Sequence, residues 1–123
     1  MKRFRFNYTQ QKELRDFLYR DDIHDAFFRK ITYNAEKKEL CIELRKISII
    51  FSGIKKMVFK NDNRWGTNET ISSLTIENCY DTLCLEDQVL DPQKHIYSLF
   101  QLFSGNEIHI LSEEIAFEEN QML

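Results

Sequence analysis

The chain has little proline and glycine, few cysteines and no long apolar run. One proline and three glycines among 123 residues exclude a collagen-like or low-complexity chain. No apolar run approaches the ~18 residues that a membrane-spanning helix needs, so no membrane association is predicted. No secretion signal follows the basic N-terminus, and the odd cysteine count (Cys41, Cys79, Cys84) indicates free thiols. We therefore expect a cytoplasmic protein.

Positive charge is nearly absent from the second half. Residues 1–64 hold sixteen Lys and Arg against nine Asp and Glu, a balance of +7, whereas residues 65–123 hold one against eleven, a balance of −10. Such an acidic half would attract a basic protein partner. Alternatively, antiparallel pairing places acidic strands beside basic ones and cancels the field, which depends on strand order. The overall pI near 5.6 argues against a nucleic-acid partner.

Hydrophobic periodicity predicts one helix followed by strands. Thr9 is the expected N-cap of a helix at about residues 10–20, in which Leu14, Phe17 and Leu18 form one apolar face. After the helix the period changes to two, as in strands. We expect one domain (1–123) of the α+β class, mainly β. The helix is followed by six to eight antiparallel strands, which pack on the helix or curl into a sandwich. Strands are predicted at residues 27–34, 40–45, 47–51, 71–76, 96–103, 107–111 and 115–119, with another ending at Val58 and Phe59.

Several local features refine this prediction. Gly53 interrupts the alternation and predicts a bend or bulge, and Ser72-Ser73 predicts an irregular strand. Ser104-Gly105-Asn106 predicts a tight hairpin connection and favours strand over helix for Leu99–Phe103. The alternating segment Lys2–Phe6 resembles a nucleic-acid-binding pattern, but we interpret it as an edge strand with its Phe side chains inward.

No catalytic motif is present. The sequence lacks a G-x-S-x-G nucleophile turn and a phosphate-binding glycine loop, so no catalytic residue, metal or cofactor is predicted. An alternative is a small metal-dependent or acid–base enzyme, because three carboxylates and an imidazole lie within five residues. The competing interpretation is structural, with these side chains ending the helix and capping backbone groups. The cluster consists of Asp21, Asp22, His24 and Asp25.

Partner contacts are predicted in the acidic half. Trp65 stands in a polar loop, where tryptophan is a good interface anchor, although the ring also has the alternative of folding back onto the sheet. Acidic residues would supply the remaining contacts with a basic partner. The predicted partner-binding residues are Trp65, Glu69, Glu77, Asp81, Glu113 and Glu114.

Parts of the chain resemble small bacterial domains of unknown function, including immunity proteins of polymorphic toxin systems. The resemblance covers about residues 20–60 and 95–118. It implies an α+β or mainly β fold and supplies no catalytic residues to transfer. It rests on Ile23-His24-Asp25-Ala26, Ile31-Thr32-Tyr33, Leu40–Leu44, Ile50–Ile54 and Gly105–Ile110.

These observations lead to one main hypothesis and two alternatives. The main hypothesis is a non-enzymatic protein-binding domain, with a toxin-neutralising immunity protein as its concrete form, since an inhibitor needs a surface and no chemistry. The first alternative is the small enzyme centred on the Asp21–Asp25 cluster. The second is a homodimer of unknown role whose exposed strand edges pair.

Overall fold

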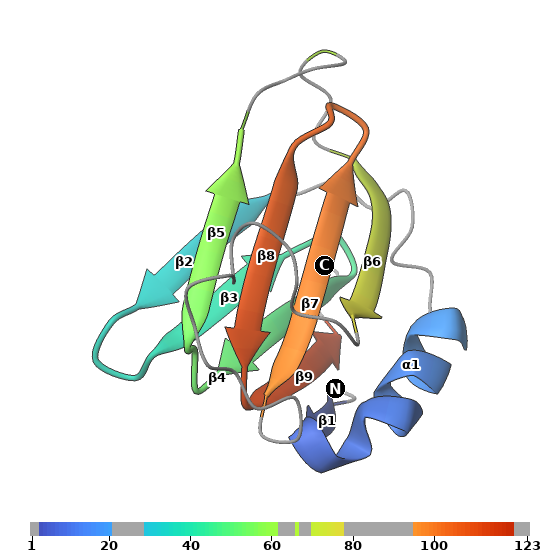
Figure 1. Cartoon of the computed structure of the whole chain (residues 1–123), viewed down its shortest axis with the longest axis vertical. Helices are drawn as coiled ribbons and strands as arrows, with labels where there is room; N and C mark the ends of the chain where they lie inside the picture. Colours follow the sequence, from blue (N-terminus) through green and yellow to red (C-terminus); the bar gives the residue numbers. More distant parts are fainter. Residues whose placement is uncertain (1–2, 21–28, 62–65, 67–69, 78–94, 120–123) are drawn as a thin grey trace.

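The computed structural model describes residues 3–20, 29–61, 66, 70–77 and 95–119. Within these residues the chain forms two packed antiparallel sheets and one α-helix (Figure 1). None of the described helices is long and apolar enough to cross a membrane. The elements are β1 (Arg3–Asn7), the 3-10 turn η1 (Tyr8–Gln10), α1 (Gln11–Arg20), β2 (Lys30–Asn34), β3 (Glu39–Glu43), β4 (Ile47–Ser52), β5 (Lys56–Lys60), β6 (Ile71–Glu77), β7 (Ile96–Leu102), β8 (Glu107–Ser112) and β9 (Glu114–Glu119).

The strand order joins the two ends of the chain. The first sheet runs β1-β9-β4-β3-β2 and the second runs β5-β8-β7-β6. The predicted class, mainly β and antiparallel with an N-terminal helix, is confirmed, and the sheets form a sandwich. The number of strands differs from the prediction, because the described residues contain nine strands and six to eight were expected. The edge strand that the Lys2–Phe6 alternation predicted is present as β1, which precedes the helix.

The core lies between the sheets and follows the alternation in the sequence. Leu40 and Ile42 on β3 and Ile49 and Phe51 on β4 have at most 1% of their surface exposed. Their register pairs Leu40 with Phe51 and Ile42 with Ile49, so one face of each strand turns inward. The second sheet contributes Phe100, whose ring lies 6.0 Å from that of Phe51. This edge-to-face contact joins the two layers.

The helix begins differently from the prediction. Asn7, rather than Thr9, is the N-terminal cap: its side chain accepts a hydrogen bond from the Thr9 N–H at 2.9 Å, and the Gln10 side chain accepts one from the Asn7 N–H. The reciprocal pair fixes a 3-10 turn that leads into α1. The predicted apolar face is confirmed, because Leu14 is fully buried and Phe17 packs against the core.

The irregular positions also match the sequence. Gly53 has φ +67°, a conformation that favours glycine. It lies in the bend that connects β4 to β5 in the other sheet. The register of β6 on β7 shifts between Ile71 and Ser73, which is the predicted irregularity. Gly105 has φ +93° in the β7–β8 connection, and the residues before it are strand rather than helix.

Ser98 is a polar residue inside the core, and its removal is expected to stabilise the fold. Its hydroxyl is buried without a hydrogen-bond partner among the described residues. Because an unsatisfied buried hydroxyl costs free energy, Ser98→Ala should raise the free energy of unfolding by about 1 kcal/mol in urea titrations. Ser104 is equally buried, but its Oγ accepts a hydrogen bond from the Asn106 N–H at 3.2 Å. Ser104→Ala should therefore destabilise, and a loss of stability in both variants would contradict the prediction.

Candidate functional site

Most of the residues singled out from the sequence lie outside the described residues. Among the predicted partner contacts, Trp65, Glu69 and Asp81 do so. The alternative acid–base cluster does so too, with all four members: Asp21, Asp22, His24 and Asp25. In the part of the chain that the structure describes, no three His, Cys, Asp or Glu side chains group closely enough to hold a metal ion.

The remaining predicted contacts do not form one patch. Glu77 ends β6 on the outer face of the second sheet, where its Oε1 accepts a hydrogen bond from the Thr75 hydroxyl at 3.3 Å. Glu114 begins β9 in the first sheet, and Glu113 precedes it in the link from β8. Glu77 and Glu114 therefore point away from opposite faces of the sandwich. The structure brings together only Glu113 and Glu114, which are sequence neighbours.

Strand order decides how the charge asymmetry is distributed. The acidic strand β9 lies beside the basic strand β1, and Arg3 and Arg5 each lie 4.0 Å from a carboxylate of β9, on Glu118 and Glu114. In the second sheet, Lys60 of β5 lies 3.8 Å from Glu107 of β8. These described strands therefore follow the alternative in which antiparallel pairing offsets the two charge signs.

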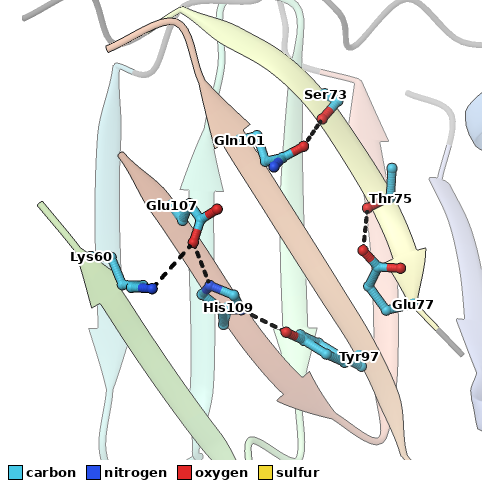
Figure 2. Close-up of polar contacts among 8 residues, drawn as sticks. All are labelled: Lys60, Ser73, Thr75, Glu77, Tyr97, Gln101, Glu107 and His109. Carbon is cyan, nitrogen blue, oxygen red and sulfur yellow. Dashed lines mark hydrogen bonds and ion pairs between the residues drawn. The ribbon is translucent and has the colours of Figure 1, made fainter. Parts of the chain in front are cut away.

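The outer face of the second sheet carries a chain of ionisable groups that crosses three strands. Figure 2 shows Lys60 on β5, Glu107 and His109 on β8, and Tyr97 on β7 in sequence along this face. The Lys60 Nζ lies 3.8 Å from Glu107 Oε1, which lies 3.1 Å from His109 Nε2. The other ring nitrogen, His109 Nδ1, lies 2.7 Å from the Tyr97 hydroxyl oxygen. We call these four residues the polar chain.

The partners of His109 define its tautomer. Because a carboxylate only accepts hydrogen bonds, the Nε2–H of the neutral imidazole donates to Glu107. Nδ1 then accepts from the Tyr97 hydroxyl, so each polar atom of the ring is satisfied.

Burial decreases steadily along the polar chain. Tyr97 is fully buried, and the side chains of His109, Glu107 and Lys60 are 6%, 28% and 47% exposed. A phenol, an imidazole and a carboxylate are groups used in acid–base catalysis. Here, however, the phenol and the imidazole are closed off from solvent, so a substrate has no direct access to them. What the geometry does provide is a set of satisfied hydrogen bonds that holds β7 and β8 in register.

Sequence reasoning missed the polar chain, although a signal was present. Glu107 and His109 are two apart in a predicted strand and must share a face. The tight turn after Phe103 sets the register that pairs His109 with Leu99 and Leu111 with Tyr97. Tyr97 is thus the diagonal neighbour of His109, within reach of a long side chain. Applying the hairpin register to the ionisable residues would have predicted this contact.

A second feature is an exposed apolar row on the edge strand β2. Ile31 and Tyr33 lie on the core-facing side of the first sheet, opposite Ile42 and Leu40. Ile42 and Leu40 are at most 1% exposed, whereas Ile31 and Tyr33 are 41% and 45% exposed. All five residues of β2 are exposed. The inner face of β2 therefore exposes apolar side chains to solvent, whereas the inner face of the neighbouring strand β3 buries them.

The other sheet has a matching residue on the same side of the sandwich. Phe59 of the edge strand β5 is 50% exposed, while its register partner Ile108 is 5% exposed. The Ile54 N–H donates to the Lys38 carbonyl, which places the link between β4 and β5 beside the β2–β3 turn. Helix α1 packs on β1 and β6 and so covers the opposite side (Figure 1). We call β2 together with Phe59 the open edge.

Comparison with protein-family models and with curated proteins finds no match to this chain. The resemblance to immunity proteins therefore stays a prediction.

Cys41 is the described cysteine, and it is expected to react slowly. It is a free, half-buried thiol on β3. Burial, followed by the charges of Glu43, Glu39 and Glu118, raises the pKa of the Cys41 thiol above its ordinary value. Since the thiolate is the nucleophile, a Cys79→Ser/Cys84→Ser variant should be alkylated by iodoacetamide more slowly when folded than in urea. The pH at which the alkylation rate is half-maximal should be higher for the folded chain than for the chain in urea. An equal or lower pH for the folded chain would contradict this prediction.

Proposed function

We propose that this chain is a non-enzymatic protein-binding domain that binds a polypeptide along the open edge. The observation that carries the proposal is the exposure of Ile31 and Tyr33 on the inner side of β2, where the neighbouring strand is buried. Contiguous exposed apolar side chains mark interaction sites, and tyrosine is frequent among the residues that dominate binding energy. The burial of Tyr97 and His109 supports the non-enzymatic part of the proposal.

The edge position suggests how the partner binds. Within the described residues β2 pairs on one side only, with β3, so its other side offers unpaired N–H and C=O groups. An extended segment of the partner adds to this edge as a further strand, and its alternate side chains cover Ile31 and Tyr33. Phe59, on the edge strand of the facing sheet, is a further exposed apolar side chain.

A toxin-neutralising immunity protein remains the concrete form of this proposal, because blocking a toxin requires only a complementary surface. We expect its partner to be basic, because residues 65–123 carry a net negative charge. Glu113 and Glu114 are its accessible test positions in the described structure, since Glu113 is exposed and Glu114 is partly so.

The test is binding to the polypeptide encoded by the adjoining reading frame, measured by calorimetry. An Ile31→Lys/Tyr33→Lys variant should bind at least about tenfold more weakly than the unmodified chain. The variant should still unfold cooperatively, with a loss of about 1–2 kcal/mol in the free energy of unfolding, because both side chains are partly exposed. Phe103→Lys is the matched control, since Phe103 is a similarly exposed apolar residue (43%) outside the open edge.

Two outcomes would contradict the proposal. Unchanged binding by the Ile31→Lys/Tyr33→Lys variant, together with loss of binding by Glu113→Lys/Glu114→Lys, would move the binding site to the acidic residues. Absence of binding by the unmodified chain would refute the toxin-neutralising form.

A further inference from the structure

The edge of β2 is complementary to itself. In an antiparallel pairing of two copies about a two-fold axis at Thr32, Ile31 of each copy faces Tyr33 of the other, and Lys30 faces Asn34. Each residue of β2 (Lys30–Asn34) then has a partner, and the outward N–H and C=O groups of both copies are satisfied. This register places an aliphatic β-branched side chain opposite an aromatic one, a favourable cross-strand pair. The exposed apolar row of each copy is covered by that of the other.

The opposite face of this pairing is complementary in charge. Lys30, Thr32 and Asn34 share the outer face with Glu43 and Glu39 of β3. Across the four strands of the joined sheet, the outer face then carries one row of neighbouring side chains: Glu43 and Lys30 of one copy, followed by Asn34 and Glu39 of the second copy. Adjacent strands are about 4.8 Å apart, so Lys30 stands roughly 10 Å from Glu39 of the second copy, a separation that the two long side chains bridge.

Glu39 is suited to this contact. In the described parts of the chain, Arg29 lies 4.0 Å from Glu43, whereas no ion pair involves Glu39. The two-fold pairing brings a lysine toward each Glu39 and places no two like charges directly opposite. The repulsion that protects many edge strands from self-association is therefore missing here.

The surroundings leave this edge accessible. In Figure 1 β2 crosses behind β5, and the β2–β3 hairpin then extends past it. All five residues of β2 are nevertheless exposed. A two-fold contact also closes on itself and produces a dimer rather than an open chain of subunits. The contact is short, below the ~1,200 Å² of standard specific interfaces, so the expected dimer is weak and depends on concentration.

We propose that, without its partner, this chain forms a weak two-fold dimer by antiparallel β2–β2 pairing centred on Thr32. The dimer rests on the open edge assigned under the proposed function and names a second copy as one occupant of it. An incoming partner strand competes with the second copy for the same edge. Self-association therefore lowers the affinity for the partner as the protein concentration rises.

Cysteine cross-linking tests the register. In a Cys41→Ser/Cys79→Ser/Cys84→Ser background, Thr32→Cys places two sulfur atoms at the axis, whereas Asn34→Cys places each opposite Lys30. The Cys41 change is needed because Thr32 faces Cys41 within one copy. With oxidised glutathione, Thr32→Cys should form covalent dimers about tenfold or more faster than Asn34→Cys, because disulfides require closely spaced Cβ atoms. A mixture of Lys30→Cys and Asn34→Cys chains should cross-link as mixed pairs.

Sedimentation equilibrium supplies the measurement without cross-linking. The mass of the unmodified chain should rise from 14.9 kDa toward twice that value between micromolar and millimolar concentration. Thr32→Lys should remain at the monomer mass, because two ammonium groups would meet at the axis. A constant monomer mass for the unmodified chain, or equal cross-linking of Thr32→Cys and Asn34→Cys, would overturn the dimer.

The two proposals fail separately. A monomeric chain whose partner binding still depends on Ile31 and Tyr33 would refute the dimer and leave the proposed function intact. If the chain dimerises through β2 but binds its partner equally well after Ile31 and Tyr33 are changed, the dimer would stand and the proposed function would be refuted.

Discussion

Phe117→Ala is expected to lower the free energy of unfolding by about 3–5 kcal/mol, the cost typical of deleting a buried phenylalanine. Phe117 is 1% exposed on β9, and its ring lies 4.7 Å from that of Phe17 on α1 and 6.1 Å from that of Phe6 on β1. One side chain thus joins the last strand to the helix and to the first strand. Urea denaturation followed by circular dichroism measures the loss.

Phe4→Ala is the matched control for this prediction. Phe4 faces Phe117 in the β1–β9 register and contacts Phe17 at 5.0 Å, but it is 42% exposed. Its loss removes less apolar contact and leaves no closed cavity, so the expected cost is about 1 kcal/mol. Equal costs for the two variants would show that the aromatic cluster does not anchor the helix as the structure has it.

Tyr97→Phe is expected to lower the free energy of unfolding by about 1–3 kcal/mol, because it leaves a buried imidazole nitrogen without its hydrogen-bond donor. Tyr97 is fully buried, His109 is 5% exposed, and the hydroxyl lies 2.7 Å from His109 Nδ1. The phenylalanine ring fills nearly the same volume, so the change reports on the lost hydrogen bond rather than on packing. Thermal and urea unfolding both measure the effect.

A double-mutant cycle separates the hydrogen bond from other contacts of Tyr97. His109→Leu removes the acceptor, so adding Tyr97→Phe to that variant should cost clearly less than Tyr97→Phe alone. Glu107 retains water and Lys60 as partners in these variants, since it is partly exposed. Strictly additive losses would mean that the short contact between Tyr97 and His109 contributes nothing to stability.

Local patterns in the sequence predicted most of the elements, because a strand of a sandwich must alternate between core and solvent. The alternation of Leu40, Ile42 and Leu44 predicted a buried face of β3, and the structure buries all three. Ser72-Ser73 predicted an irregular strand, and the register of β6 shifts there. The helix start was less predictable, because Asn7 and Thr9 are both good caps and only backbone geometry distinguishes them.

The candidate sites depended more strongly on long-range pairing. Ile31 and Tyr33 carry the alternation typical of a buried face, and only the edge position of β2 exposes them. Glu114 was singled out by its charge alone, and only the pairing of β9 with β1 places Arg5 4.0 Å from it. Ile31 and Tyr33 were correctly assigned to a strand, whereas Glu114 lies one residue before the predicted strand 115–119 and begins β9. In both cases the surroundings of the side chain are supplied by a segment distant in the chain.

The sequence by itself determined the class of the fold, the faces of its strands, the helix and the bends, because these follow from the spacing of neighbouring residues. Tertiary structure alone decided which strands meet, since antiparallel sheets of similar composition can be ordered in many ways. That order pairs the basic first strand with the acidic last one, gathers Tyr97, His109 and Glu107 on one face, and leaves β2 uncovered. The candidate surfaces are therefore set by contacts between residues far apart in sequence.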